Sequence, residues 1–98
     1  MRVLGVDCGT EYTGFGVVEL GSDGKLLCLT CGAVKLSPRE AMAKRLSKIF
    51  DELSAIIRQQ KPDNVAIEDV FYAVNVKSAL KLGQVRGVAM LADRKSVV

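Results

Sequence analysis

The distribution of apolar, β-rich and turn-forming residues predicts three strands in the first 36 residues. Residues 2–6 are nearly all apolar, which is typical of a central strand covered on both faces. Two further β-rich stretches follow at 13–20 and 26–36, and a Gly-Ser-Asp-Gly turn at 21–24 separates them. Three consecutive strands joined by short loops predict an antiparallel meander.

A helical period replaces this pattern after residue 36. Ser37, Pro38 and Glu40 predict a helix start, with serine as the N-cap, proline at the first helical position and glutamate completing a capping box. The helix is expected to end near Gln60, before Pro62. Its apolar residues recur at helical spacing and form one stripe, with charged residues on the other side: Met42, Leu46, Ile49, Phe50, Leu53, Ile56 and Ile57.

The last third of the chain predicts one more strand and one more helix. Residues 65–67 form a short apolar strand that follows a helix, which favours parallel pairing with a neighbour in the sheet. A second helix is expected over about 76–92. The order βββαβα predicts an α/β fold, in which helices pack against a mixed sheet. At 98 residues, the chain is expected to form a single domain, 1–98.

Composition narrows the class of protein. The chain is 49% apolar and 26% charged, as in an ordinary globular protein, and no apolar run approaches the roughly 20 residues of a membrane span. We therefore expect a cytoplasmic protein with no membrane partner. The net charge of +3 is uneven, because residues 75–98 carry five basic side chains and one acidic one. That asymmetry indicates a polyanionic partner such as nucleic acid, or simply a solvated helix face.

The cysteines are Cys8, Cys28 and Cys31. The last two have the C-x-x-C spacing of half a zinc site or of a redox pair. Zinc would lack ligands, since the chain has no histidine and no second pair. Residues three apart in a strand are also expected to point to opposite faces. The spacing therefore favours ordinary strand positions over a metal or redox site, and the odd count suits a reducing compartment.

Two of the apolar runs end in an acid. Asp7 follows residues 2–6, and Glu68 follows residues 65–67. Magnesium commonly binds one or two carboxylates together with water and substrate phosphate. On adjacent strands, these acids could hold two ions about 4 Å apart, which would activate a water and stabilise the leaving oxygen of a phosphodiester. The pattern equally allows both acids merely to cap the loops that follow.

A different chemistry is also compatible with the first acid. Asp7, Gly9 and Thr10, placed between two strands, resemble the phosphate-binding start of the actin and sugar-kinase group. That interpretation requires a second phosphate loop and an adenosine pocket in a much longer chain, and the sequence contains neither.

Two sequence blocks resemble the RuvC family of Holliday junction resolvases. The first is LGVDCGT at 4–10, continuing as TGFGVV at 13–18. The second comprises Pro62-Asp63, AIEDVF at 66–71, Asn75, SALKLGQ at 78–84 and RGVA at 86–89. The resemblance covers about residues 2–92. The second block argues against another metal nuclease of the same fold, such as an RNA-processing enzyme.

This resemblance implies an RNase H-like fold, a homodimer, magnesium (with manganese as a substitute) and paired nicks across four-way junction DNA. Branch-migration motor proteins are the implied protein partners. Asp7 and Glu68 match the family's first two catalytic, metal-binding carboxylates. The second helix is similar to the family's dimer helix, so that Leu80, Leu82 and Met90 are either interface or core.

Three other residues match positions that would meet DNA. Phe71 corresponds to an aromatic residue at the unpaired centre of the junction, where it could stack on a base, or else anchor its own loop in the core. Lys81 and Arg86 are expected to contact backbone phosphates, which would make the affinity salt-dependent.

The chain departs from the family pattern in two places. Cys8 stands where the family usually has proline, a position that is not a ligand. The family also continues beyond residue 92 with another strand, a basic segment and a last helix that carries two more acidic ligands, whereas this chain ends at Val98. We therefore expect a truncated domain that cleaves junctions poorly or not at all. The alternative is a catalytically silent short protein that binds junctions or dimerises.

Overall fold

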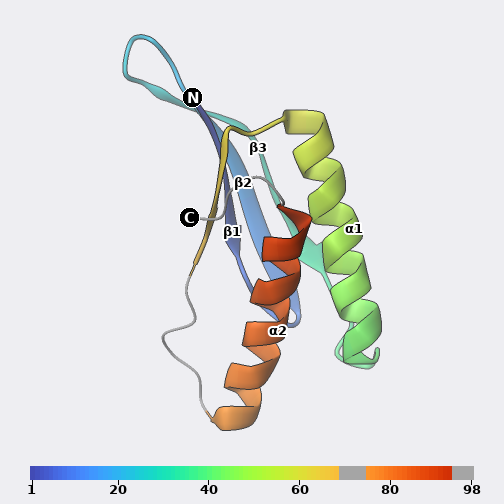
Figure 1. Cartoon of the computed structure of the whole chain (residues 1–98). Coiled ribbons are helices and arrows are strands. Elements are labelled where there is room, and N and C mark those ends of the chain that lie inside the picture. The colour runs from blue at the N-terminus through green and yellow to red at the C-terminus, as the bar shows by residue number, and fades with distance from the viewer. Residues whose placement is uncertain (69–74, 94–98) are drawn as a thin grey trace.

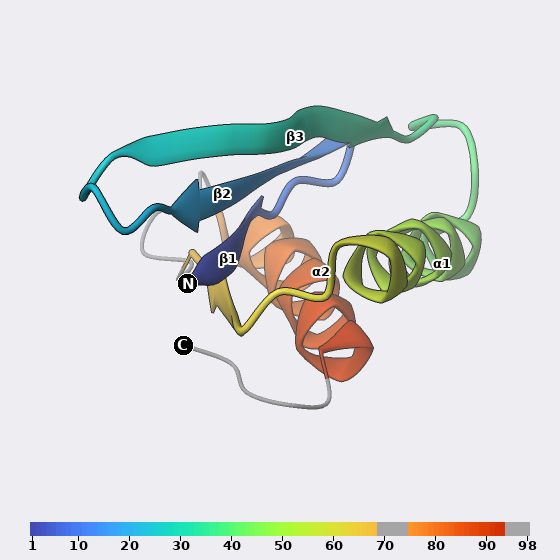
Figure 2. The same cartoon turned by 90° about the horizontal axis from the view of Figure 1, so that it is seen from above.

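The chain forms one mixed sheet with both helices packed against the same face (Figures 1 and 2). This computed structural model describes residues 1–68 and 75–93. The predicted order βββαβα is confirmed, and the sheet order is β3-β2-β1-β4. The elements are β1 (Arg2–Asp7), β2 (Tyr12–Leu20), β3 (Leu26–Lys35), α1 (Met42–Gln60), β4 (Asn64–Ile67) and α2 (Val76–Ala92).

Strand pairing follows the expected connections. β1 pairs antiparallel with β2, and β2 pairs antiparallel with β3, so the predicted meander is confirmed. β4 arrives through α1 and pairs parallel with β1, as a crossover through a helix requires. Val6 lies opposite Phe15 on one side and opposite Ile67 on the other, which makes β1 the central partner of two strands.

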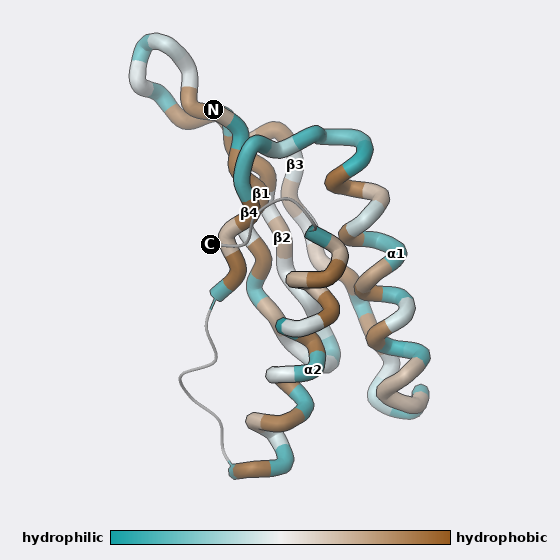
Figure 3. The backbone as a smooth tube through the Cα atoms, in the orientation of Figure 1, coloured by the Kyte–Doolittle hydropathy of each residue, from teal (hydrophilic) through white to brown (hydrophobic). Residues whose placement is uncertain are grey.

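The core lies between the sheet and the helices. Alternate residues of β1 and β4 are buried on this face, and the helices meet them mainly through Ile49 and Leu53 of α1 and Val85 of α2. Apolar segments, brown in Figure 3, recur along the strands and on both helices. The buried apolar residues are Leu4, Val6, Val17, Val34, Leu36, Ile49, Leu53, Val65, Ile67, Val85 and Ala89.

The prediction that residues 2–6 are covered on both faces is wrong for the part of the chain that the structure describes. Both helices lie on one side of the sheet (Figure 2). Val3 and Gly5 point to the other side and stay partly exposed. The apolar run does not distinguish a strand that is buried on both faces from one that is buried on a single face. Glycine is counted as apolar, but it has no side chain that must be buried. We refer to this uncovered side as the open face.

The predicted helix start is also wrong. Ser37 begins a turn instead, accepting hydrogen bonds from the Glu40 amide on its carbonyl (3.1 Å) and from the Arg39 amide on its hydroxyl (3.3 Å). The chain cannot enter the helix at this point because Leu36 is still held at the sheet, where its amide donates to the Glu11 carbonyl (2.8 Å). The helix begins at Met42, after an Ala41 N-cap that has no side-chain cap.

The other helix boundaries agree with the sequence. α1 ends at Gln60 as predicted, and Lys61 takes a left-handed conformation (φ 48°) that returns its amide to the Ile57 carbonyl. α2 spans the predicted residues and begins at the Asn75 N-cap, whose side chain accepts from the Ser78 amide (2.9 Å). Within the described residues, neither helix is long and apolar enough to cross a membrane.

A β-bulge in β3 overturns the expectation for Cys28 and Cys31. Val17 pairs with Thr30, but Val18 pairs with Cys28, so one extra residue is inserted into β3 at this point. Cys31 pairs with Gly16. Positions 16 and 18 of β2 share one face, and the two cysteines opposite them therefore share a face as well.

Candidate functional site

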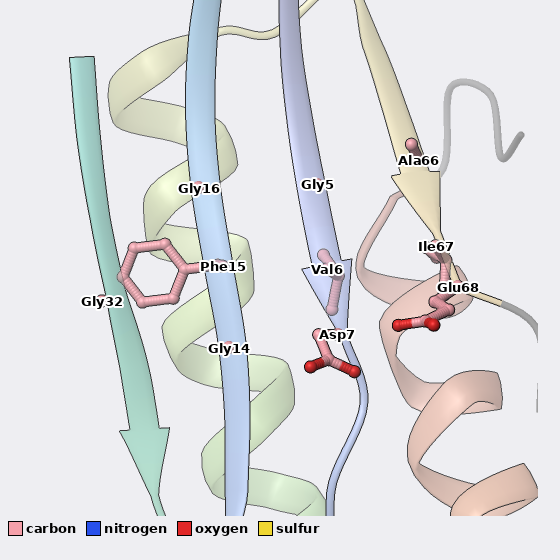
Figure 4. Close-up of a pocket in the computed structure, with 10 residues that line it drawn as sticks. All are labelled: Gly5, Val6, Asp7, Gly14, Phe15, Gly16, Gly32, Ala66, Ile67 and Glu68. Carbon is pink, nitrogen blue, oxygen red and sulfur yellow. The ribbon is translucent and has the colours of Figure 1, made fainter. Parts of the chain in front are cut away.

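Asp7 and Glu68 end adjacent parallel strands at the same level of the sheet. Val6 is paired with Ile67, and the Glu68 amide donates to the Val6 carbonyl (3.2 Å), which extends the register by one residue. Because successive side chains alternate between faces, both acids lie on the open face, where each is exposed. Figure 4 shows their carboxylates beside each other. The structure thus brings together the two residues that the sequence proposed as a pair.

The two acids carry no large cost of burial. Both carboxylates are exposed, so each keeps most of its hydration. Their convergence is the informative feature, because two chain segments 61 positions apart place like charges side by side. In the described residues, no cluster of three or more potential ligands from His, Cys, Asp and Glu is present. Among those residues, the acidic ligands that this end of the sheet offers to a metal are therefore Asp7 and Glu68.

The surface beside the acids is shallow and has few side chains. Gly14 lies opposite Asp7, and a Cβ at that position would lie 3.7 Å from the Asp7 Cβ. Gly5 lies opposite Gly16, next to Ala66 of β4. Small residues therefore leave the surface next to the carboxylates open to close approach by another molecule. Figure 4 shows this depression, lined by Gly5, Val6, Asp7, Gly14, Phe15, Gly16, Gly32, Ala66, Ile67 and Glu68.

The loop that follows Asp7 is fixed by Thr13. This residue is fully buried; its hydroxyl donates to the Gly9 carbonyl (2.9 Å) and accepts from the Gly9 amide (3.3 Å). No residue with a side chain fits at position 9 in this conformation, because a Cβ there would lie only 2.1 Å from the Tyr12 carbonyl oxygen. The loop therefore leaves β1 in one conformation, which holds the end of the strand and Asp7 in place.

Arg45 of α1 ties the same loop to the helix. Its guanidinium donates to the carbonyls of Thr10 (3.4 Å) and Pro38 (2.9 Å), and also to that of Glu40 (3.0 Å). The sequence pattern placed Arg45 only on the charged side of α1 and Thr13 only in a strand. The position of Thr13, four residues after Gly9, could have indicated this role, since that spacing allows a hydroxyl to hydrogen-bond the backbone and close a tight loop.

Cys8 directly follows Asp7, and the pKa of its thiol reflects burial and the nearby charges. Burial and the charges of Asp7 and Glu68 together raise the pKa of the Cys8 thiol to about 11, against the opposing effect of the Arg86 charge. The Cys8 side chain packs against the core, so it is a neutral thiol near neutral pH. Arg86 of α2 is consequently close enough to Cys8 to act on its thiol electrostatically.

Of the three predicted DNA-contacting residues, Lys81 and Arg86 lie within the described part of the chain. Arg86 and Lys81 both lie on α2 and are half-buried. Arg86 also contacts the sulfur of Met90, one turn along the helix (3.3 Å). Phe71 lies outside the described residues, and its role stays a prediction. The structure therefore places Arg86 near Cys8, the residue after Asp7.

Comparison with known proteins assigns the chain to a family. Residues 3–98 match the family described as crossover junction endodeoxyribonuclease RuvC. A relative of that name from Koribacter versatilis is 63% identical over 92 residues, which is 94% of this chain and 55% of the relative. The chain thus spans about half the length of the curated relatives it matches.

Comparison with solved structures identifies the fold. The structure of T. thermophilus RuvC in complex with a Holliday junction substrate superposes with a TM-score of 0.86 at 29% identity, covering 94% of this chain and 57% of that one. The yeast mitochondrial Holliday junction resolvase Ydc2 superposes at 0.66 with 15% identity over 91% of this chain and 42% of that one, which shows likeness of fold alone. The predicted RNase H-like fold is confirmed.

Proposed function

Since the chain belongs to the RuvC family of crossover junction endodeoxyribonucleases, we propose that it supplies the first part of a metal-dependent site that cleaves four-way DNA junctions. The observation that carries this proposal is the convergence of Asp7 and Glu68 at adjacent strand ends on the open face. Residues that merely capped loops would have no reason to meet there. The actin-like and RNA-processing alternatives have no comparable support.

The donor set suits magnesium. Two exposed carboxylates with open space in front of them fit an ion that takes one or two protein carboxylates and fills its remaining positions with water and phosphate oxygens. When bound, magnesium or manganese would supply an activated water and charge neutralisation at the scissile phosphodiester. Asp7 and Glu68 would hold the ion, while Gly14 and Gly16 leave room for the DNA backbone.

Phosphate contacts would come from α2. Arg86 is near the acidic end of β1, and Lys81 lies five residues earlier on the same helix. Replacing either side chain with alanine should reduce the slope of log affinity against log salt by about 0.9, the value for one phosphate. Phe71 would stack on a base at the junction centre, as the family resemblance implies.

Dimerisation is proposed through the exposed side of α2. This helix is apolar on both sides, because Val85 and Ala89 are buried whereas Val76, Leu80 and Leu91 are 77%, 65% and 61% exposed. A surface helix normally keeps one face polar. A second copy covering this stripe would pair two sites for two nicks. Leu82 is half-buried and Met90 is 38% exposed, so of the three predicted interface residues Leu80 suits the role best.

The remaining parts of the proposal follow from family membership. Branch-migration motor proteins would deliver the junction, and the protein would act in the cytoplasm on recombining DNA. Residues 1–98 would belong to a single nuclease domain, to which the family's further acidic residues would add.

The test is an assay of a labelled four-way DNA junction with the purified chain, with and without magnesium, on denaturing and native gels. Symmetric nicks that require magnesium and disappear in Asp7→Asn and Glu68→Gln would support the nuclease. Asp51→Asn is the matched control, because Asp51 is an exposed carboxylate on α1. A junction that is shifted but uncut would mean that the chain binds junctions without cleaving them, as expected both of a chain that supplies only the first part of the site and of the silent binding alternative. Neither a shift nor a cut would contradict both.

A further inference from the structure

Cys28 and Cys31 form a pair of thiols on the open face. The bulge after Val18 places them opposite Val18 and Gly16, which are two residues apart on one face of β2. Both cysteines are exposed and free. β3 is the outermost strand of the sheet, so reagents in solution reach the pair without opening the core.

The pair is separate from the carboxylates. Cys31 aligns with Gly16 and Gly5, whereas Asp7 aligns with Gly14. Two strand spacings and two residue steps along the sheet put Cys31 about 12 Å from Asp7. The thiols and the acids therefore occupy one face without sharing a ligand set.

The two thiols interact with each other. The Cys28 thiol donates to the Thr30 carbonyl (Sγ–O 3.6 Å), so it is directed along the strand toward Cys31. Partial desolvation, the charge of Cys31 and a hydrogen bond with the Cys31 thiol all raise the pKa of Cys28. Neighbours on one face of a strand are about 6.6–6.8 Å apart at Cα, the upper end of the range that a disulfide spans.

We propose that Cys28 and Cys31 form a reversible intramolecular disulfide across the β3 bulge. A bond near the limit of its span is more easily reduced than a structural disulfide, and it would therefore respond to the redox state of the surroundings.

The oxidant is a low-molecular-weight disulfide, RSSR. One thiolate of the pair attacks RSSR, forms a mixed disulfide and releases one RS⁻, which takes up the proton that the thiol lost. The second thiolate then attacks the protein sulfur of the mixed disulfide and releases a second RS⁻, which is protonated in the same way. The pair loses two electrons and two protons, and RSSR becomes two RSH.

The experiment equilibrates the full 98-residue chain with mixtures of reduced and oxidised glutathione, quenches by alkylation and measures intact mass. We expect a monomer lighter by two hydrogens, with Cys28 and Cys31 protected and Cys8 still alkylated after denaturation. The thiol–disulfide equilibrium constant of the folded chain should exceed that of the same chain in concentrated urea by about tenfold, which corresponds to about 30 mV. Mixed glutathione adducts without the intramolecular bond, or equal constants in both states, would overturn the proposal.

A positional control separates folded geometry from mere closeness in sequence. The double variant Thr30→Cys/Cys31→Thr keeps two cysteines in β3, even closer along the chain, but moves one thiol to the position opposite Val17, whose side chain faces the helices. We expect this variant to accumulate mixed adducts, with folding checked by circular dichroism. Internal disulfide formation as favourable as in the parent chain would contradict the role of the bulge.

Discussion

The Thr13 hydroxyl provides a direct test of how the fold holds the candidate site. Thr13→Val keeps the shape of a fully buried side chain and removes its two hydrogen bonds to Gly9, at 2.9 and 3.3 Å. Both polar groups of Gly9 then lose their partner next to Asp7. Leaving a buried polar group without a partner costs about 1–3 kcal/mol.

The expected decrease in stability has a measurable size. The added methyl group recovers part of the lost stabilisation, so we expect the free energy of unfolding to fall by about 1–2 kcal/mol. For a domain of this length that is a drop in Tm of roughly 5–15 °C. Urea titration measures the free energy, and a magnesium titration of thermal stability should show a smaller gain in the variant, because the end of β1 is less well held.

The matched control is Thr30→Val on the neighbouring strand. Thr30 is half-buried, and its hydroxyl makes no hydrogen bond within residues 1–68 and 75–93, so its free energy of unfolding should change by less than about 0.5 kcal/mol. If Thr13→Val were as stable as this control, the hydroxyl would not be what holds the loop. The proposed link between Gly9 and Asp7 would then be refuted.

Three further predictions concern single positions. Gly9→Ala should destabilise the fold by more than about 2 kcal/mol, because its Cβ would lie 2.1 Å from the Tyr12 carbonyl oxygen; stability equal to the parent chain in urea would contradict this contact. Gly87→Ala should stabilise the monomer by about 0.5–1 kcal/mol, since nothing lies within 4 Å of its Cβ position, while analytical ultracentrifugation should show weaker dimerisation if α2 is the interface. Burial, Asp7 and Glu68 raise the pKa of Cys8 from 9.0 to about 11, so the native state retains the proton longer than the unfolded state does. The stabilisation by the neutral thiol is complete below about pH 9 and is lost toward pH 11; urea titrations across this range should show a steeper decline for the parent chain than for Cys8→Ala.

Local patterns in the sequence were sufficient for most of the architecture. The β-rich runs with their turn signals, the apolar stripe of α1 and the crossover to β4 predicted the right element order and the right neighbour for β1. These features depend on residues that are close together in the chain, and the helical period of 3.6 residues can be recognised directly from the order of apolar and polar side chains. The acids at the ends of two apolar runs likewise marked Asp7 and Glu68 before their meeting was known.

Two local signals were misleading because a distant contact prevailed. Ser37, Pro38 and Glu40 match a capping box, but the Glu11 carbonyl holds Leu36 at the sheet and the helix starts five residues after Ser37. Cys28 and Cys31 were assigned to opposite faces, since a bulge is produced by pairing with β2 and has no marker of its own in the sequence.

The amino-acid pattern specifies the elements, their order and the acids Asp7 at the end of β1 and Glu68 directly after β4. The face that those acids occupy, the position of Gly14 opposite Asp7 and the shared face of the two β3 cysteines depend on strand pairing. Strand register sets these features, because it joins segments that are far apart in the chain. A shift of one residue in pairing would move every side chain to the other face without changing any local pattern.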